Sequence, residues 1–85
     1  MWYKVENKLP DKTTRYASTY GVPVLVYDEQ EAIDSGYYVP TLMSFSYETQ
    51  TFKTLASGIT GRTEWVEAFW VSHWTELPLT PGKEE

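Results

Sequence analysis

The segment VPVLVYD, residues 22–28, constrains the fold of this chain more than any other. Five of its seven residues favour β-strands, and Asp28 ends the run. Pro23 has no backbone N–H to donate, so it belongs at the beginning of the strand or on the edge of a sheet. The segment therefore predicts a strand around which a sheet is built.

Further strands are expected on both sides of this segment. MWYKV (1–5) has the aromatic and β-branched content of a short first strand. Residues 37–57 predict a hairpin that turns at residues 48–51, because three large residues (Met43, Phe45 and Tyr47) alternate with serines. Residues 29–36 form either one helical turn or a long hairpin loop, and no amphipathic helix is expected there.

The C-terminal part of the chain is ambiguous between helix and strand. Its aromatic and β-branched residues after Ala68 favour a strand from about residue 69, and residues 62–68 are expected to hold a short helical turn. The fold class is thus mainly β: a small antiparallel sheet or partly open barrel of about five strands. Residues 1–80 form a single compact domain, and residues 81–85 are a disordered tail.

Composition sets the class of protein. The 85 residues are enough for one core, to which four Trp, seven Tyr and three Phe contribute large side chains. Without cysteine the chain has no disulfides or thiolate metal ligands, and without an apolar run of about 20 residues it has no membrane span. A cytoplasmic location is expected. The net charge of −5 disfavours binding to duplex DNA, and no membrane partner is expected.

Catalytic and metal chemistry lack the residue patterns that they need. There is no cysteine and no G-x-S-x-G, and the single histidine, His73, has no aspartate at a telling spacing. His73 is expected to be structural, half exposed or bonded to the backbone, because a metal site would need further ligands. A general acid–base pair could come from one polar stretch, but a solvated loop is the favoured interpretation; its acids are Asp28, Glu29, Glu31 and Asp34. No catalytic residue, metal or cofactor is predicted.

Two loops have the composition of an anion site. SGITGRT (57–63) combines two glycines with an arginine and hydroxyls, although it lacks the Walker lysine and its spacing. DKTTRY (11–16) is basic and hydroxyl-bearing, with tyrosines at its end and after it. Charge for a phosphate beside a flat apolar surface for a base suits a nucleotide. The predicted ligand-binding residues are Lys12, Arg15, Tyr16, Tyr20, Ser57, Thr60, Arg62 and Thr63; the alternative for 57–63 is a flexible hairpin connection.

A protein-binding face is a second possibility. Tyr37 and Tyr38 are adjacent, so one is expected inside and the other outside, and an outward tyrosine next to acidic residues suits an interface. Glu31 and Tyr38 are the predicted partner-binding residues. Exposed strand edges in so short a chain also predict a homodimer or larger ring.

The ends of the chain carry a family resemblance. Trp2, Leu9-Pro10, VPVLVYD and the closing VSHWTELP (71–78) follow one another in the order seen in the small phage and prophage proteins of domain-of-unknown-function family 551. The chain resembles that family over nearly its whole length, apart from a longer middle at residues 28–68. The resemblance implies a phage origin, action in an infected bacterial cell and a compact β fold. It suggests that the first and last strands lie together, with Trp2 and Trp74 in one core and Pro10 and Pro78 ending their strands.

These observations predict a non-enzymatic phage accessory binding protein. The leading hypothesis is a counter-defence sponge that sequesters a small anionic, nucleotide-type signal. The first alternative is an inhibitor that binds a host defence protein through its acidic, tyrosine-bearing face. The second alternative is a carboxylate-dependent hydrolase.

Overall fold

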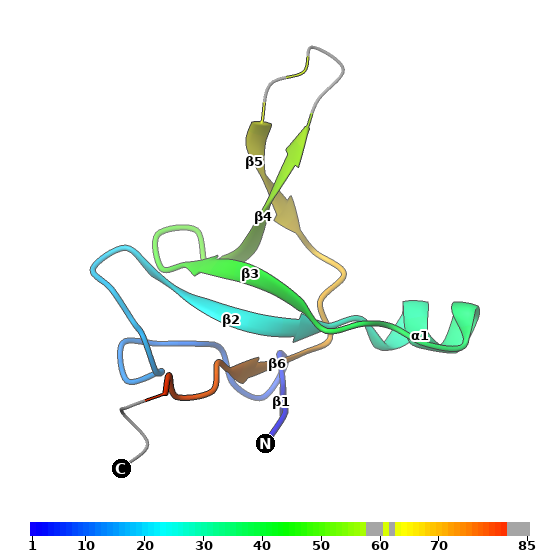
Figure 1. Ribbon diagram of the computed structural model, residues 1–85, viewed down its shortest axis with the longest axis horizontal. Helices are drawn as coiled ribbons and strands as arrows, with labels where there is room; N and C mark the ends of the chain where they lie inside the picture. Colours follow the sequence, from blue (N-terminus) through cyan, green and yellow to red (C-terminus); the bar gives the residue numbers. More distant parts are fainter. Residues whose placement is uncertain (58–60, 62, 82–85) are drawn as a thin grey trace.

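The fold is a single open antiparallel sheet with one short helix (Figure 1). The computed structural model describes residues 1–57, 61 and 63–81. Six strands are formed by these residues, in the sheet order β1-β6-β2-β3-β4-β5. The elements are β1 (Tyr3–Lys4), β2 (Gly21–Tyr27), α1 (Glu29–Ser35), β3 (Thr41–Ser46), β4 (Thr51–Ser57), β5 (Thr63–Ala68) and β6 (His73–Glu76). The predicted mainly β class is confirmed.

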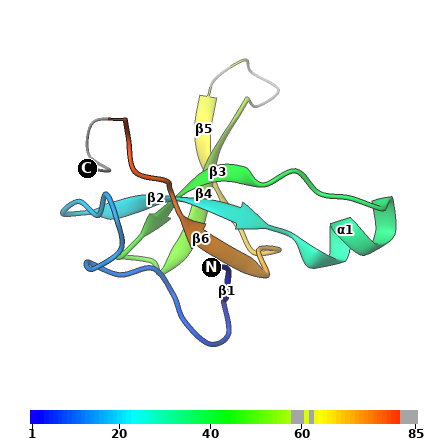
Figure 2. The ribbon, with the colours of Figure 1, turned by 60° about the horizontal axis from the view of Figure 1, so that its bottom comes forward.

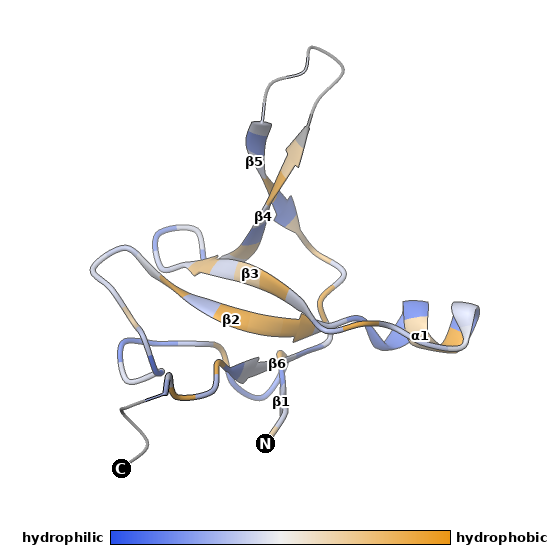
Figure 3. Cartoon of the chain, viewed as in Figure 1, coloured by the Kyte–Doolittle hydropathy of each residue, from blue (hydrophilic) through white to orange (hydrophobic). Residues whose placement is uncertain are grey.

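β2 is the central strand and follows the period of two that the sequence predicts. Val22, Val24 and Val26 are fully buried, and the residues between them face the other side of the sheet. Pro23 lies inside the strand, but the ladder to β6 begins only at Val24, so Pro23 has a paired neighbour on the β3 side alone. The missing N–H of proline is tolerated at such a local edge. Figure 3 shows hydrophobic residues concentrated in β2 and β3 and a mainly hydrophilic α1.

The sheet is curled, and the short connection between β5 and β6 requires it. These strands stand four positions apart in the sheet, which is about 19 Å in a flat sheet with strands about 4.8 Å apart. Only residues 69–72 join them, and the five Cα steps from Ala68 to His73 reach at most about 18 Å when fully extended. Residues 69–70 form a turn, which shortens the connection further. The ends of β5 and β6 can meet only because the sheet bends around the core.

The core fills the concave face of this curled sheet. One row of four buried residues crosses four strands: Val22, Phe45, Phe52 and Ala68. Val24, Val26, Met43, Val71 and Trp74 complete the core. Trp74 is 1% exposed, its indole N–H donates to the carbonyl of Lys8 at 2.7 Å, and its ring lies 4.8 Å from that of Tyr3. The N-terminal segment therefore closes the core over the last strand.

Three sequence-based expectations for the tryptophan-rich segments are wrong. Residues 63–68 form β5 and not a helical turn, because pairing with β4 from Ser57 to Phe52 overrides the weak local preference. The chain turns at residues 69–70, where a strand was expected, and β6 begins at His73. Trp2 is 42% exposed and outside the core, because strand alternation in β1 turns Tyr3 inward in its place.

The pairing of first and last strands is confirmed. β1 pairs with β6 through Tyr3 opposite Trp74 and Lys4 opposite His73. Pro10 is buried well after the end of β1, and Pro78 follows β6 by two residues, so neither proline directly ends a strand. Residues 82–85, most of the predicted tail, lie outside the described residues.

The segment between β2 and β3 contains the helix α1, which resolves the alternative left open for residues 29–36. The Asp28 side chain caps it by accepting from the N–H of Glu31 at 3.1 Å, and Gly36 ends it with φ = 88°. None of its residues is buried, and both Figure 1 and Figure 2 show it projecting away from the sheet. Within the described residues, no helix is long and apolar enough to cross a membrane.

Candidate ligand-binding groove

The predicted loop 11–16 holds the C-terminal segment in place. The N–H of Arg15 donates to the carboxylate of Glu76 at 2.5 Å, and its guanidinium donates to the carbonyl of Leu77 at 2.6 Å. The hydroxyl of Tyr16 donates to the carbonyl of Pro78 and accepts from the N–H of Thr80, both at 3.0 Å. We call Arg15, Tyr16 and residues 76–80 the C-terminal clamp. The side chains of Arg15 and Tyr16, both predicted to bind a ligand, thus form hydrogen bonds within the protein.

Asp11 shapes the start of this loop. Its carboxylate accepts from the hydroxyl of Thr13 at 2.5 Å and from the N–H of Thr13 at 2.8 Å. These hydrogen bonds, first that of the hydroxyl, hold the pKa of Asp11 below its ordinary value. Its neighbour Lys12 is exposed. The loop geometry therefore rests on Asp11, and Lys12 stays at the surface.

The second predicted loop is only partly described. Thr60 and Arg62 lie outside the described residues. Ser57 and Thr63 are opposite each other in the β4–β5 hairpin. Thr63 is exposed and lies two residues before Trp65, which puts the two on the same face of β5. Of the predicted residues in this loop, Thr63 therefore lies on the same surface as Trp65.

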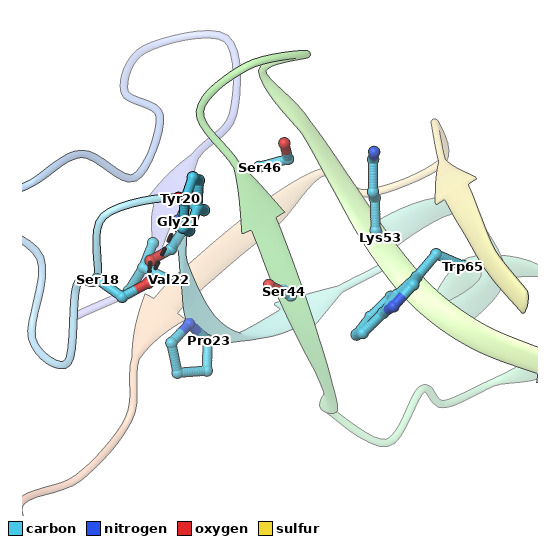
Figure 4. Close-up of a pocket in the computed structure, with 9 residues that line it drawn as sticks. All are labelled: Ser18, Tyr20, Gly21, Val22, Pro23, Ser44, Ser46, Lys53 and Trp65. Carbon is cyan, nitrogen blue, oxygen red and sulfur yellow. Dashed lines mark hydrogen bonds between the residues drawn. The ribbon is translucent and has the colours of Figure 1, made fainter.

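A shallow groove of about 370 Å³ crosses the convex face of the sheet, opposite the core (Figure 4). Its lining comes from the end of the N-terminal loop and from four strands: Ser18, Tyr20, Gly21, Val22, Pro23, Ser44, Ser46, Lys53 and Trp65. A second hollow of about 300 Å³ adjoins it and shares Pro23, Ser44, Lys53 and Trp65. Leu42 and Leu55 extend this second hollow. We refer to the two together as the groove.

Strand register explains why the groove is hollow. Pro23, Ser44, Lys53 and Glu67 form a cross-strand row one residue away from the buried row of Val22. Proline and serine are short side chains, so the floor is low between the larger residues at each side. Gly21 extends the floor because a Cβ there would lie 2.3 Å from the carbonyl oxygen of Phe45. The close approach of β2 and β3 thus requires glycine at one end of the groove.

Two aromatic side chains and one cation line the groove. Tyr20 is 84% exposed and Trp65 is 58% exposed, so their rings are available to a ligand. In Figure 4 the side chain of Lys53 rises from β4 beside that of Trp65, with the hydroxyls of Ser44 and Ser46 on β3. Glu67 is opposite Lys53 on β5, and its carboxylate accepts from the hydroxyl of Thr51 at 2.8 Å. The groove therefore offers ring faces, an ammonium group and hydroxyls, with one carboxylate at its side.

His73 and the acidic residues lie elsewhere. His73 is half buried on β6, and its Nδ1 is 2.9 Å from the hydroxyl of Ser72, which fits the expected half-exposed position. Glu31 is exposed on α1 and accepts from the hydroxyl of Ser35 at 2.8 Å. Within residues 1–57, 61 and 63–81, no three histidine, cysteine, aspartate or glutamate side chains gather as a metal site would require.

Sequence reasoning found one edge of the groove and missed its floor. Of the predicted ligand-binding residues, Tyr20 is the one that the described structure places in its lining. Ser44 and Ser46 could have been found, because their alternation with Met43 and Phe45 assigns them to the outer face. Lys53 could have been added only with the register of β4 against β3.

Searches with protein-family models, against curated proteins and against solved structures found no match. The resemblance to family 551 therefore stays a prediction, and the functional argument rests on the geometry of the groove.

Proposed function

We propose that this protein binds a small anionic ligand with a flat ring system, of the nucleoside phosphate class, in the groove. The observation that carries the proposal is the placement of Lys53 in a low-floored groove between two exposed aromatic side chains, Tyr20 and Trp65. An ammonium group can pair with a phosphate, and an exposed indole or phenol ring can stack on a base. Ser44 and Ser46 add hydroxyls for hydrogen bonds.

The dimensions of the groove agree with such a ligand. Small-molecule sites are commonly about 300–1,000 Å³, and the larger hollow alone measures about 370 Å³. The groove is shallow, so it suits a ligand that lies flat on the sheet. Because stacking on an exposed ring is worth about 1–3 kcal/mol, Trp65 is expected to give the largest single contribution to affinity.

The first test is a thermal-shift and calorimetric titration of the purified chain with AMP and ADP. Adenosine serves as the control without phosphate, and inorganic pyrophosphate as the control without a base. A ligand at about 100 times its dissociation constant stabilises the fold by about 2.7 kcal/mol, which is a readily measured shift. The nucleotides should bind more tightly than either control. Equal behaviour of all four compounds would contradict the proposal.

Matched variants then assign the site. Trp65→Ala should abolish the nucleotide-dependent shift, whereas Trp70→Ala, which removes a tryptophan of similar exposure outside the groove, should leave it intact. Lys53→Met should weaken binding of AMP and ADP and leave adenosine unchanged. Lys12→Met tests the loop 11–16 of the sequence-based hypothesis. Loss of binding in Lys12→Met alone would move the site from the groove to that loop.

Glu67 supplies a test with the opposite sign. Its carboxylate stands opposite Lys53 and opposes an incoming phosphate through like charge. Glu67→Gln keeps an oxygen to accept from Thr51 but removes the charge. This variant should therefore bind nucleotides more tightly, and the gain should shrink as salt is added because added ions screen exposed charges.

The role in a cell rests on the resemblance to family 551. In that setting, binding without turnover would sequester a nucleotide signal of the host, as a counter-defence sponge does. The corresponding measurement is chromatography of the nucleotide after prolonged incubation with the protein. The sponge requires intact nucleotide, and loss of it with release of phosphate or base would favour the hydrolase alternative.

A further inference from the structure

A further hollow, separate from the groove, lies where β1, β2 and β6 meet. It measures about 230 Å³ and is lined by Trp2, Tyr27, Pro40 and His73. The ring of Tyr38 packs edge-on against that of Tyr27, with the centroids 5.7 Å apart. Trp2 lies 5.9 Å from Tyr27 and is 42% exposed, so much of its indole is open to a partner. We call this hollow the aromatic slot.

The slot is held in shape by the polypeptide around it. Tyr27 contacts the rings of three neighbours, including that of His73 at 6.1 Å. The hydroxyl of Ser72 contacts Nδ1 of His73 at 2.9 Å, lies 3.0 Å from the carbonyl of Tyr27 and accepts from the N–H of Glu29 at 2.9 Å. These contacts tie β2, β6 and the start of α1 together. The Tyr27 and His73 walls of the slot are therefore preorganised, which lowers the entropy lost on binding.

The size of the slot selects the kind of occupant. At about 230 Å³ it falls below the common range of about 300–1,000 Å³ for whole small-molecule ligands. It is large enough for one or two side chains of a longer partner. Aromatic walls of this kind accept proline rings from a polyproline II segment, whose conformation is already fixed before binding.

The charged residues next to the slot restrict the kind of partner further. The excursion from Tyr27 to Tyr38 leaves the sheet at the slot and returns to it, and it contains no lysine or arginine. It carries four carboxylates, those of Asp28, Glu29, Glu31 and Asp34. One base lies close by: Lys4 is opposite His73 and lines an adjoining hollow together with Glu6 and Glu29. The face beside the slot is thus acidic and complements a basic peptide.

We propose that the aromatic slot binds an extended, proline-containing segment of a partner protein, with a lysine or arginine that lies against α1. Prolines fill the space between Trp2, Tyr27 and Pro40. The basic residue meets the carboxylates of α1, a helix that buries none of its own residues in the sheet. The acidic, tyrosine-bearing face then has a binding role, and the partner is defined by its prolines and its basic residue.

The test is fluorescence anisotropy with a labelled peptide, APPLPPRK, titrated with the whole chain. Binding should fall by about tenfold or more in Trp2→Ala, the effect of losing one aromatic anchor. Trp70→Ala is the matched control, because Trp70 has similar exposure and does not line the slot, and it should bind as the parent does. A peptide with its prolines replaced by alanine should not bind. Glu29→Gln combined with Glu31→Gln should weaken binding, as should added salt.

Other outcomes would overturn the proposal. Equal binding of the proline and alanine peptides would show that charge alone attracts the peptide to the acidic face. Competition by choline that depends on Trp2, with no binding of the peptide, would assign the slot to a small organic cation. AMP binding in Trp2→Ala should match the parent, so a failed peptide test leaves the groove proposal to be judged separately.

Discussion

Two adjacent rows of residues cross the same four strands, and one row is buried whereas the other lies on the opposite face of the sheet. The first row, Val22, Phe45, Phe52 and Ala68, is at most 4% exposed and forms the centre of the core. The second row, Pro23, Ser44, Lys53 and Glu67, is one residue away on every strand and lines or flanks the groove. Strand alternation alone separates them. Stability and the proposed ligand binding therefore depend on different residues of the same strands, and substitutions can test each alone.

The largest difference is expected between the two tryptophans Trp74 and Trp65. Trp74→Ala removes a residue that is 1% exposed together with its hydrogen bond to Lys8, and should cost about 3–5 kcal/mol. Trp65→Ala, on the convex face, should change stability by about 0.5 kcal/mol or less. Urea denaturation of both variants measures this directly. Comparable losses would show that the convex face also carries the fold.

Gly21 tests how tightly β2 and β3 pack at one end of the groove. Gly21→Ala places a Cβ 2.3 Å from the carbonyl oxygen of Phe45, which the backbone must move to relieve. We expect a loss of about 1–3 kcal/mol, the usual cost of overpacking. Equilibrium denaturation gives the value, with Gly36→Ala as a comparison in which strain comes from the positive φ of 88° and not from contact. An unchanged stability of Gly21→Ala would mean that β2 and β3 can separate without cost.

The C-terminal clamp should contribute less. Tyr16→Phe removes the hydroxyl that joins Pro78 and Thr80, while the ring remains. Because these hydrogen bonds are exposed, the expected loss is about 1 kcal/mol. Hydrogen exchange at the N–H of Thr80 should accelerate in this variant, and exchange in β3 should not. Equal acceleration in both places would show that the clamp supports the whole sheet.

The smallest expected effect is a pH dependence from Asp11. Hydrogen bonds from Thr13 lower its pKa below the ordinary value of 3.8, so its contribution is present above that pH. The contribution is lost as the pH falls through the folded-state pKa, because the protonated carboxyl is the weaker acceptor. In melting experiments from about pH 6 to about pH 2, the difference between the parent and Asp11→Asn should shrink. A difference that does not change with pH would exclude Asp11 as the source.

Local patterns predicted the central part of the sheet well. The valines of β2 and the alternation around Met43 and Phe45 define buried faces without any knowledge of the partners. The prediction for the segment after residue 62 failed because its assignment depends on pairing with β4, which joins residues from Ser57 and Thr63 to Phe52 and Ala68. The prediction for Trp2 failed for a related reason. The family resemblance suggested a core position, whereas the pairing of Tyr3 with Trp74 fixed which residues of β1 face the core.

The candidate site was harder to predict than the fold. Composition directed attention to basic loops, but Arg15 and Tyr16 have partners more than sixty residues away in the sequence. The groove residues are ordinary serines, a proline and a lysine that become a site only through register. A chemical pattern that arises from strand pairing has no signal in a single sequence.

The contacts between the two ends of the chain also govern how the protein is made. Trp74 contacts Tyr3 and Lys8, and Arg15 forms hydrogen bonds with Glu76 and Leu77. These contacts join residues that are 61 to 71 positions apart in the sequence. Contacts at such separations slow folding, because a long loop must close before they can form. On the ribosome, β2, β3 and β4 can pair early, but the core stays open until β6 has left the exit tunnel. The newly made chain therefore exposes its valine-rich central strands to chaperones and to other chains until β6 has been made.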